Sequence, residues 1–139
     1  MEGHSATLCF TGALLFLLGL LTGFGIPRFR SPRIGLSAHL AAIESGLALI
    51  AFGLLLPHLL LSEASAAGIT HVLWISLYVL WIGLVVGALY GTGKTLPIAG
   101  AGFTAKAWQE NTAGVLVAIG SLGSAGAVIV LLVQWQWYQ

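Results

Sequence analysis

Two side chains that could do chemistry, His39 and Glu44, lie five residues apart in an apolar segment. Residues 47–56, which follow them, are all apolar. A carboxylate in hydrocarbon costs about 2.5–3.5 kcal/mol even on the scale that penalises it least, and such residues usually face a protein interior and mark a functional site. We therefore expect Glu44 to be the most deeply buried ionisable residue of the chain, with the function centred on its helix.

The composition predicts an integral membrane protein. Of the 139 residues, 58% are hydrophobic and only 6% are charged. Apolar stretches long enough to cross a bilayer core of about 30 Å occur at residues 8–26, 36–61, 69–90 and 111–135. These stretches are continuous, whereas the strands of a membrane barrel would alternate apolar and polar residues. We expect a single all-α domain, a polytopic bundle of four transmembrane helices.

The distribution of basic residues predicts the orientation in the cell (inner) membrane. All Lys and Arg residues fall in the first and third connections between spans. They are Arg28, Arg30, Arg33, Lys94 and Lys106. Because Lys and Arg concentrate in cytoplasmic loops, we expect these two connections to be cytoplasmic and both termini to lie on the outer side.

Small residues recur four positions apart in every expected helix, a spacing that lets helix backbones approach closely. The simpler interpretation is close packing within one bundle. The alternative is that some of these faces meet other subunits, because four short spans enclose little volume and a pocket is easier to build between protomers. The pairs are Gly19/Gly23, Ala42/Gly46, Gly83/Gly87, Gly120/Ser124 and Gly123/Ala127.

His39 is a candidate metal ligand near the start of the second helix. It shares a helix face with Ala42 and Gly46, which are small, so a large planar group could lie against that face. Glu44 and Ser45 point elsewhere, about 140° and 240° round the helix from His39. The alternative role for His39 is capping or snorkelling at the membrane interface.

Glu44 also has a structural alternative, a hydrogen bond to a neighbouring helix through Tyr78 or through a Ser or Thr. Burial would favour the neutral acid unless a cation paired with it. Tyr78 and Trp81 share a face of the third helix, where they either pack in the core or form a wall for an aromatic substrate. Glu110 is expected to cap the last helix, since a carboxylate favours a helix N-terminus.

Several stretches resemble the hydroxylaminobenzene mutase family, over roughly residues 12–135. They lie at the end of the first span, at the entry to the second span and before the last span. The family is similar, more distantly, to the styrene oxide isomerases. The stretches are residues 14–23, 32–40 and 96–100, with the acidic Glu110 opening the last span.

The resemblance implies a small membrane enzyme that assembles as a homotrimer and binds haem b between its subunits. The axial histidine of the epoxide isomerases opens their second helix, and its match here is His39. Arg33, Ala42 and Gly46 would then contact the haem. The bilayer and a small aromatic substrate are the other expected partners, and no nucleic acid is expected, because five basic residues tethered at a membrane do not form a phosphate-tracking face.

The resemblance also implies the reaction, an intramolecular hydroxyl migration that converts hydroxylaminobenzene to 2-aminophenol. The expected catalytic residues are Glu44, Ser45 and Tyr78, and the expected substrate-binding residues are Trp81 and Tyr90. Where the epoxide isomerases carry Asn before Gly, this chain has Ser45, and Glu44 beside it would supply the missing polarity. Tyr78 or Tyr90 would stand for the active-site tyrosine of those enzymes.

A neutral Glu or a Lewis acid, such as ferric haem on His39, would weaken the N–O bond of the substrate. Aromatic faces and a carboxylate would stabilise the resulting cation. The alternative function is a small proton-coupled multidrug exporter with Glu44 as the coupling carboxylate, because such exporters are also four-helix proteins with one membrane-embedded Glu. A third possibility is a non-catalytic membrane subunit.

Overall fold

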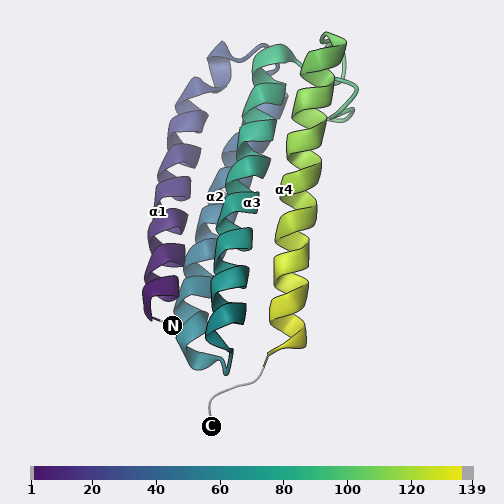
Figure 1. Cartoon of the computed structure of the whole chain (residues 1–139). Coiled ribbons are helices and arrows are strands. Elements are labelled where there is room, and N and C mark those ends of the chain that lie inside the picture. The colour runs from purple at the N-terminus through teal and green to yellow at the C-terminus, as the bar shows by residue number, and fades with distance from the viewer. Residues whose placement is uncertain (1, 136–139) are drawn as a thin grey trace.

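The structure, a computed structural model, describes residues 2–135 and is built from helices over that range. Helix α1 (Glu2–Gly25) continues into the short 3-10 helix η1 (Ile26–Arg28), and α2 (Pro32–Leu55) continues into η2 (Leu56–His58). Helices α3 (Glu63–Tyr90) and α4 (Ala107–Val133) complete the bundle (Figure 1). All four α-helices are long and apolar enough to cross a membrane, so the predicted all-α bundle of four such helices is confirmed.

Helix α2 does not begin and end where the predicted apolar stretch, residues 36–61, begins and ends. Polar and proline residues near its two ends determine its limits. The helix begins at Pro32, before predicted residue 36, since Ser31 precedes it as N-cap and accepts a hydrogen bond at 3.5 Å from the Ile34 N–H. It ends at Leu55, before predicted residue 61, since Pro57 lacks an N–H and cannot continue an α-helix. His39 is therefore two turns inside α2.

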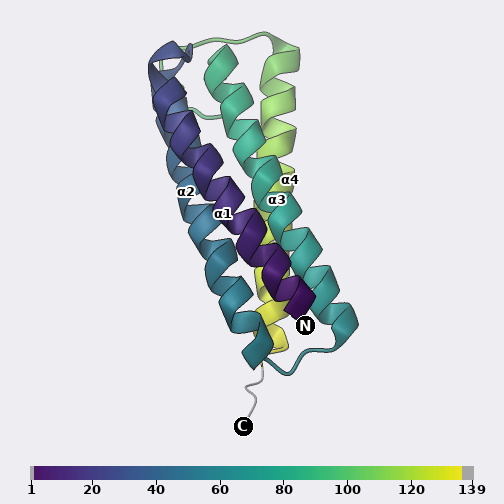
Figure 2. The ribbon, with the colours of Figure 1, turned by 90° about the vertical axis from the view of Figure 1, so that its left-hand side faces the viewer.

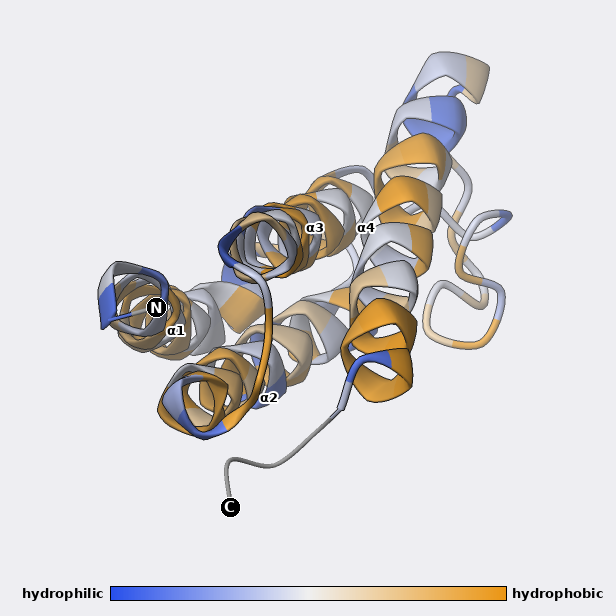
Figure 3. Ribbon diagram, turned by 60° about the horizontal axis from the view of Figure 1, so that its bottom comes forward, coloured by the Kyte–Doolittle hydropathy of each residue, from blue (hydrophilic) through white to orange (hydrophobic). Residues whose placement is uncertain are grey.

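The four helices are unequally packed. Helix α1 packs mainly against α2 and crosses at an angle toward the far end of α3 (Figure 2), whereas α4 packs mainly against α3 and lies on the far side of it from α1 (Figure 3). The α1–α2 and α3–α4 connections lie at the same end of the bundle (Figure 1). The basic residues therefore gather at one end, which is called the basic end below.

Small residues hold the helices at close range within the protomer, as the simpler interpretation predicted. Gly12 in α1 and Gly46 in α2 face each other, and a Cβ at either would lie 2.7 Å from the carbonyl oxygen of the other. Gly19 faces Ala42 in the same seam. Between α3 and α4, a Cβ at Gly120 would lie 2.5 Å from the backbone nitrogen of Leu80. Any larger side chain at these glycines would push the helices apart.

The interior is filled mainly by leucines, including Leu8, Leu15, Leu49 and Leu73. The outer faces of the helices also carry many large hydrophobic side chains. Leu122 of α4, for example, is 74% exposed. An apolar interior under an apolar exterior suits a protein whose solvent is lipid rather than water.

Candidate active site

Glu44 lies near the middle of α2 but on its outward face. The buried stripe of α2 includes Ala42 and Gly46, and Glu44 lies about 200° round the helix from Ala42. Its neighbours on the outward face are the exposed leucines Leu40 and Leu47. The prediction that Glu44 is the most deeply buried ionisable residue is therefore wrong for the protomer, because the small residues of α2 turn toward α1 and carry Glu44 to the opposite side.

The Glu44 carboxylate has no hydrogen bond or ion pair within residues 2–135. The alternative of a structural hydrogen bond to Tyr78 is also wrong, since the Tyr78 hydroxyl donates to the Thr11 carbonyl of α1 at 2.8 Å. Ser45, the next residue, is half-buried. The carboxylate is thus free to meet a ligand or another molecule at the surface of the protomer.

His39 occupies the seam between α1 and α2. Its Nδ1 lies 2.7 Å from the Gly19 carbonyl oxygen, and because a carbonyl only accepts, Nδ1 carries the proton. In the neutral ring Nε2 then has a free lone pair, and no residue in the described part of the chain bonds it. Metal-binding histidines typically donate one ring N–H to a carbonyl in this way, which fixes the ring and leaves the other nitrogen as the ligand.

The donor chemistry of His39 therefore fits the role of an axial ligand to a haem iron, which needs one protein ligand. Arg33, at the start of α2, is exposed, and its guanidinium has no partner among the described residues. No cluster of three or more His, Cys, Asp or Glu side chains suited to a metal ion occurs within residues 2–135. A metal site at His39 would thus depend on a group that brings its own remaining ligands, as haem does.

The predicted contact surface for that group is not open in the protomer. Ala42 is fully buried, and Gly46 is closed off by Gly12 and Phe16 of α1. Both residues pack helix against helix, so a planar group could lie on them only if α1 moved away. A group bound to His39 would have to extend from Nε2 toward the surface instead.

His39 and Glu44 do not meet within one protomer. They are separated by about 7.5 Å along α2 and about 140° round it, as the helical spacing predicted. His39 turns toward α1, where a Cβ added to Gly23 would lie 2.8 Å from its Nδ1. Glu44 turns toward the outside. A site that uses both residues would need a second copy of the chain.

The aromatic candidates on α3 fall into two groups. Tyr78 and Trp81 share a face, as predicted, and both reach α1, where Trp81 Nε1 donates to Thr22 Oγ1 at 3.2 Å. Tyr90, the last residue of α3, lies about 13 Å further along the axis than Trp81. It packs edge-on against Trp108, with ring centroids 5.4 Å apart. The structure therefore does not bring Trp81 and Tyr90 into one wall.

Glu110 is the buried carboxylate that the sequence reasoning did not find. It is 7% exposed, and its oxygens accept hydrogen bonds from the backbone N–H groups of Lys94 at 3.2 Å and Thr95 at 2.9 Å. The Thr95 hydroxyl lies 2.9 Å from the same carboxylate. Glu110 was expected to cap α4, but it fastens the α3–α4 connection to that helix. The capping side chain is Gln109, whose Oε1 accepts from the Lys106 N–H at 2.9 Å.

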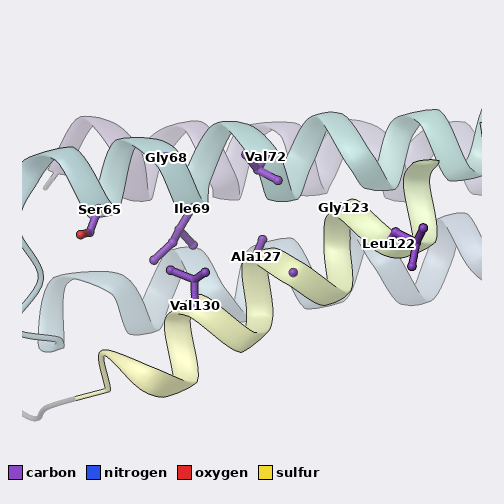
Figure 4. Close-up of a pocket in the computed structure, with 9 residues that line it drawn as sticks. Ser65, Gly68, Ile69, Val72, Leu122, Gly123, Ala127 and Val130 are labelled. Carbon is purple, nitrogen blue, oxygen red and sulfur yellow. The ribbon is translucent and has the colours of Figure 1, made fainter. Parts of the chain in front are cut away.

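An apolar groove of about 340 Å³ lies between α3 and α4 at the end away from the basic residues (Figure 4). Its walls are made by small and aliphatic residues such as Ile69, Val72 and Ala127, and Ser65 is the one hydroxyl among its lining residues. The groove contains no titratable side chain. The candidate active site is therefore the surface of α2 that carries Glu44, not this groove.

Comparisons with known proteins cover nearly the whole chain. A family model described as styrene oxide isomerase matches residues 4–135. Hydroxylaminobenzene mutase HabB of Ectopseudomonas oleovorans is 36% identical over 125 residues, which cover 89% of this chain and 75% of that protein. Hydroxylaminobenzene mutase HabA of the same organism is 41% identical over 90 residues, which cover 64% and 67% respectively.

Proposed function

Because this chain belongs to the styrene oxide isomerase family and is an isomerase or mutase, we propose that it converts hydroxylaminobenzene-type arylhydroxylamines to 2-aminophenols. The reaction is an isomerisation: the N–O bond breaks, a C–O bond forms at the ortho carbon, and the proton lost from that carbon is balanced by one gained at nitrogen. No oxidant or reductant is needed. The names of HabB and HabA support this substrate class, and they give no support to a drug exporter.

The structural observation that carries the proposal is the unpaired carboxylate of Glu44 in the middle of a membrane helix. A neutral Glu44 can donate its proton to the hydroxyl oxygen of the substrate and so assist N–O cleavage. The resulting carboxylate then stabilises the cationic aryl nitrogen and accepts the proton released from the ring, so that it is again neutral. The oxygen, which now carries two hydrogens, bonds to the ortho carbon and passes one of them to the nitrogen, which completes the NH2 and OH groups of the product. The Ser45 hydroxyl beside it orients the migrating oxygen.

Tyr78 has a different place in this proposal. Its hydroxyl proton is directed to the Thr11 carbonyl. We therefore assign no proton transfer to Tyr78 and assign it, with Trp81, to holding α1 against α3. The aromatic rings of these residues remain candidates for contact with an aromatic substrate.

The catalytic unit in the proposal is a homo-oligomer, with a trimer as the expected size. A carboxylate left in lipid costs about 2.5–3.5 kcal/mol at the least, and a second copy packed over the outward face of α2 removes that cost. Such packing also allows Glu44 of one copy to approach the His39 face of another. Chemical cross-linking and native mass spectrometry of detergent-purified protein would measure the assembly, and a strictly monomeric active enzyme would refute it.

We propose that His39 holds a haem b, with Arg33 available to pair with a propionate at the basic end. When bound, the haem would supply a Lewis acid to the N–OH group of the substrate. His39→Ala is expected to abolish the Soret band while the protein still inserts, because the imidazole that faces Gly19 and Gly23 of α1 is removed. His58→Ala, at the opposite end of the bundle, is the matched control. An unchanged spectrum in His39→Ala would exclude His39 as the ligand.

The proposed location is the inner membrane, with the α1–α2 and α3–α4 connections in the cytoplasm. The shared position of all basic residues at one end of the bundle supports this orientation. Reporter fusions after Gly68 and after Gly102 should report opposite sides of the membrane. The same side for both fusions would overturn the topology.

The activity is tested by incubating purified protein with hydroxylaminobenzene and following 2-aminophenol by chromatography. Running the reaction in ¹⁸O-labelled water tests the mechanism as well. Transfer within one molecule leaves the product unlabelled, whereas attack by solvent water on the cation labels it. Absence of turnover would refute the substrate class, and a labelled product would refute intramolecular transfer while leaving the isomerase activity in place.

A further inference from the structure

A cleft of about 700 Å³ at the basic end lies between the α3–α4 connection and the first turns of α4. Its lining residues change from polar to apolar along the axis of α4. Lys94, Thr95, Glu110 and Asn111 line the end near the connection, and the apolar residues Val115 and Ala118 line the part further along α4. A cleft that is charged and polar at one end and apolar at the other is suited to an amphiphile rather than to a soluble ion.

The polar end of the cleft is rigidly built. Gly91 ends α3 with a left-handed φ of 68°, which turns the chain into the connection. Glu110 then fixes the next segment by accepting hydrogen bonds from the backbone N–H groups of Lys94 and Thr95. The backbone from which the Lys94 side chain extends is therefore held against α4 and does not depend on a flexible loop.

The unused hydrogen-bond donors of the cleft favour an anion, since its one acidic residue, Glu110, is already hydrogen-bonded. The Lys94 ammonium and the Asn111 amide are exposed and have no partner in the part of the chain that the structure describes. The negative charge of Glu110 is already stabilised by amide and hydroxyl donors. Lys94 and Asn111 thus offer unused N–H donors to a phosphate.

The position of the cleft along α4 matches the levels at which the headgroup and the acyl chains of a membrane lipid lie. Ala118 lies about 12 Å further along α4 than Glu110, at 1.5 Å per residue. Tyr90 and Trp108 pack edge-on near the polar end, and such amphipathic aromatics are enriched at the level of lipid headgroups. The polar end of the cleft therefore lies at headgroup level, and its apolar part lies beside the acyl chains.

We propose that this cleft is a binding site for an anionic phospholipid. Lys94 and Asn111 bind the phosphodiester group, and an acyl chain lies along Val115 and Ala118. Basic pockets at the ends of transmembrane helices are known sites for acidic lipid headgroups. The site is separate from the face of α2 that carries Glu44, so it does not depend on the proposed reaction. The groove of Figure 4 has no charged lining residue and provides an internal contrast, a place where acyl chains would bind without headgroup selectivity.

The test measures thermal unfolding of the detergent-purified full chain with added phosphatidylglycerol or phosphatidylcholine of the same acyl chains. We expect phosphatidylglycerol to raise the unfolding temperature by several degrees more than phosphatidylcholine, because only the former adds a net negative charge. Lys94→Gln should remove this difference. Arg28→Gln, which removes one positive charge at the same end but outside the cleft, should retain it.

Three results would overturn the proposal. Equal stabilisation by the two lipids would mean that only acyl chains bind. Equal loss in Lys94→Gln and Arg28→Gln would mean a general charge effect rather than a site. Stabilisation by inorganic phosphate alone, to the same extent as by phosphatidylglycerol, would mean an ion site without a lipid.

Native mass spectrometry provides a second readout that does not depend on unfolding. The native chain should retain a phosphatidylglycerol molecule that Ala118→Leu, which fills the apolar part of the cleft, fails to retain. The matched variant Ala125→Leu, at an exposed position of α4 outside the cleft, should retain it. Loss of the lipid from both variants, or from neither, would contradict the site.

Discussion

Glu44 and Glu110 are chemically identical side chains in opposite situations. Glu110 is 7% exposed and is held by backbone amides and a hydroxyl of the α3–α4 connection. Glu44 lies near the middle of a membrane helix on its outward face and has no partner within residues 2–135. The carboxylate that is buried is the structural one, and the carboxylate that faces outward is the one left available for chemistry.

The comparison shows that burial alone does not mark a functional carboxylate in a membrane protein. The hydrogen-bond partners of a carboxylate distinguish a structural role from a functional one. A carboxylate whose acceptor sites are filled is stabilised in its ionised form and has little capacity to exchange a proton. An unpartnered one in lipid is unstable as it stands and must be completed by a ligand or by another protein surface. Substitutions at the two positions should therefore affect different properties.

The largest expected effect is on stability, at Glu110. Glu110→Ala removes the acceptor of the Lys94 and Thr95 N–H groups, and each such part-buried hydrogen bond to a charged group contributes about 1.5–3 kcal/mol. Denaturation in detergent should show a clear loss of stability, while any residual folded protein retains its rate per molecule. An Ala variant as stable as the native chain would mean that the connection does not depend on this carboxylate.

The next effect is on rate, at Glu44. Glu44→Gln preserves shape but cannot donate a proton, so we expect at least about a tenfold loss of turnover, equivalent to roughly 1.4 kcal/mol of barrier. Its unfolding temperature should match that of the native protein, because no intramolecular bond is lost. Glu2→Gln, a carboxylate at the far end of α1, is the matched control. Full activity in Glu44→Gln would make Glu44 a bystander, and a collapse of folding would make it an essential helix contact.

The smallest effect is expected at Tyr78. Its substitution tests whether an inward hydroxyl contributes to stability, as Glu110 is expected to, or to the reaction rate, as Glu44 is expected to. Tyr78→Phe removes the hydrogen bond to Thr11, and a neutral hydrogen bond contributes about 0.5–1.5 kcal/mol to stability. Turnover by the folded fraction should remain close to native. A loss of rate as large as that of Glu44→Gln would mean that Tyr78 has a catalytic role after all.

Much of the candidate site could be predicted from local sequence. The separation of His39 and Glu44 onto different faces of α2 follows from helical geometry, and the structure confirms it. The burial of Glu110 could not be predicted in the same way, because its partners, Lys94 and Thr95, belong to a connection whose path no periodicity describes. The Gly19 carbonyl that orients His39 comes from another helix and is equally outside local sequence.

The sequence by itself determined the all-α bundle of membrane-length helices, the basic end and the family, although not where each helix begins and ends, because these features depend on composition and on the order of residues along the chain. Only the tertiary structure decided which way Glu44 points. In water, the apolar side of a helix is its buried side, but lipid is as apolar as a protein core, so hydropathy cannot distinguish the two faces of α2. The distinction comes from which small residues a neighbouring helix can approach, and in α2 these are Ala42 and Gly46, on the side opposite Glu44.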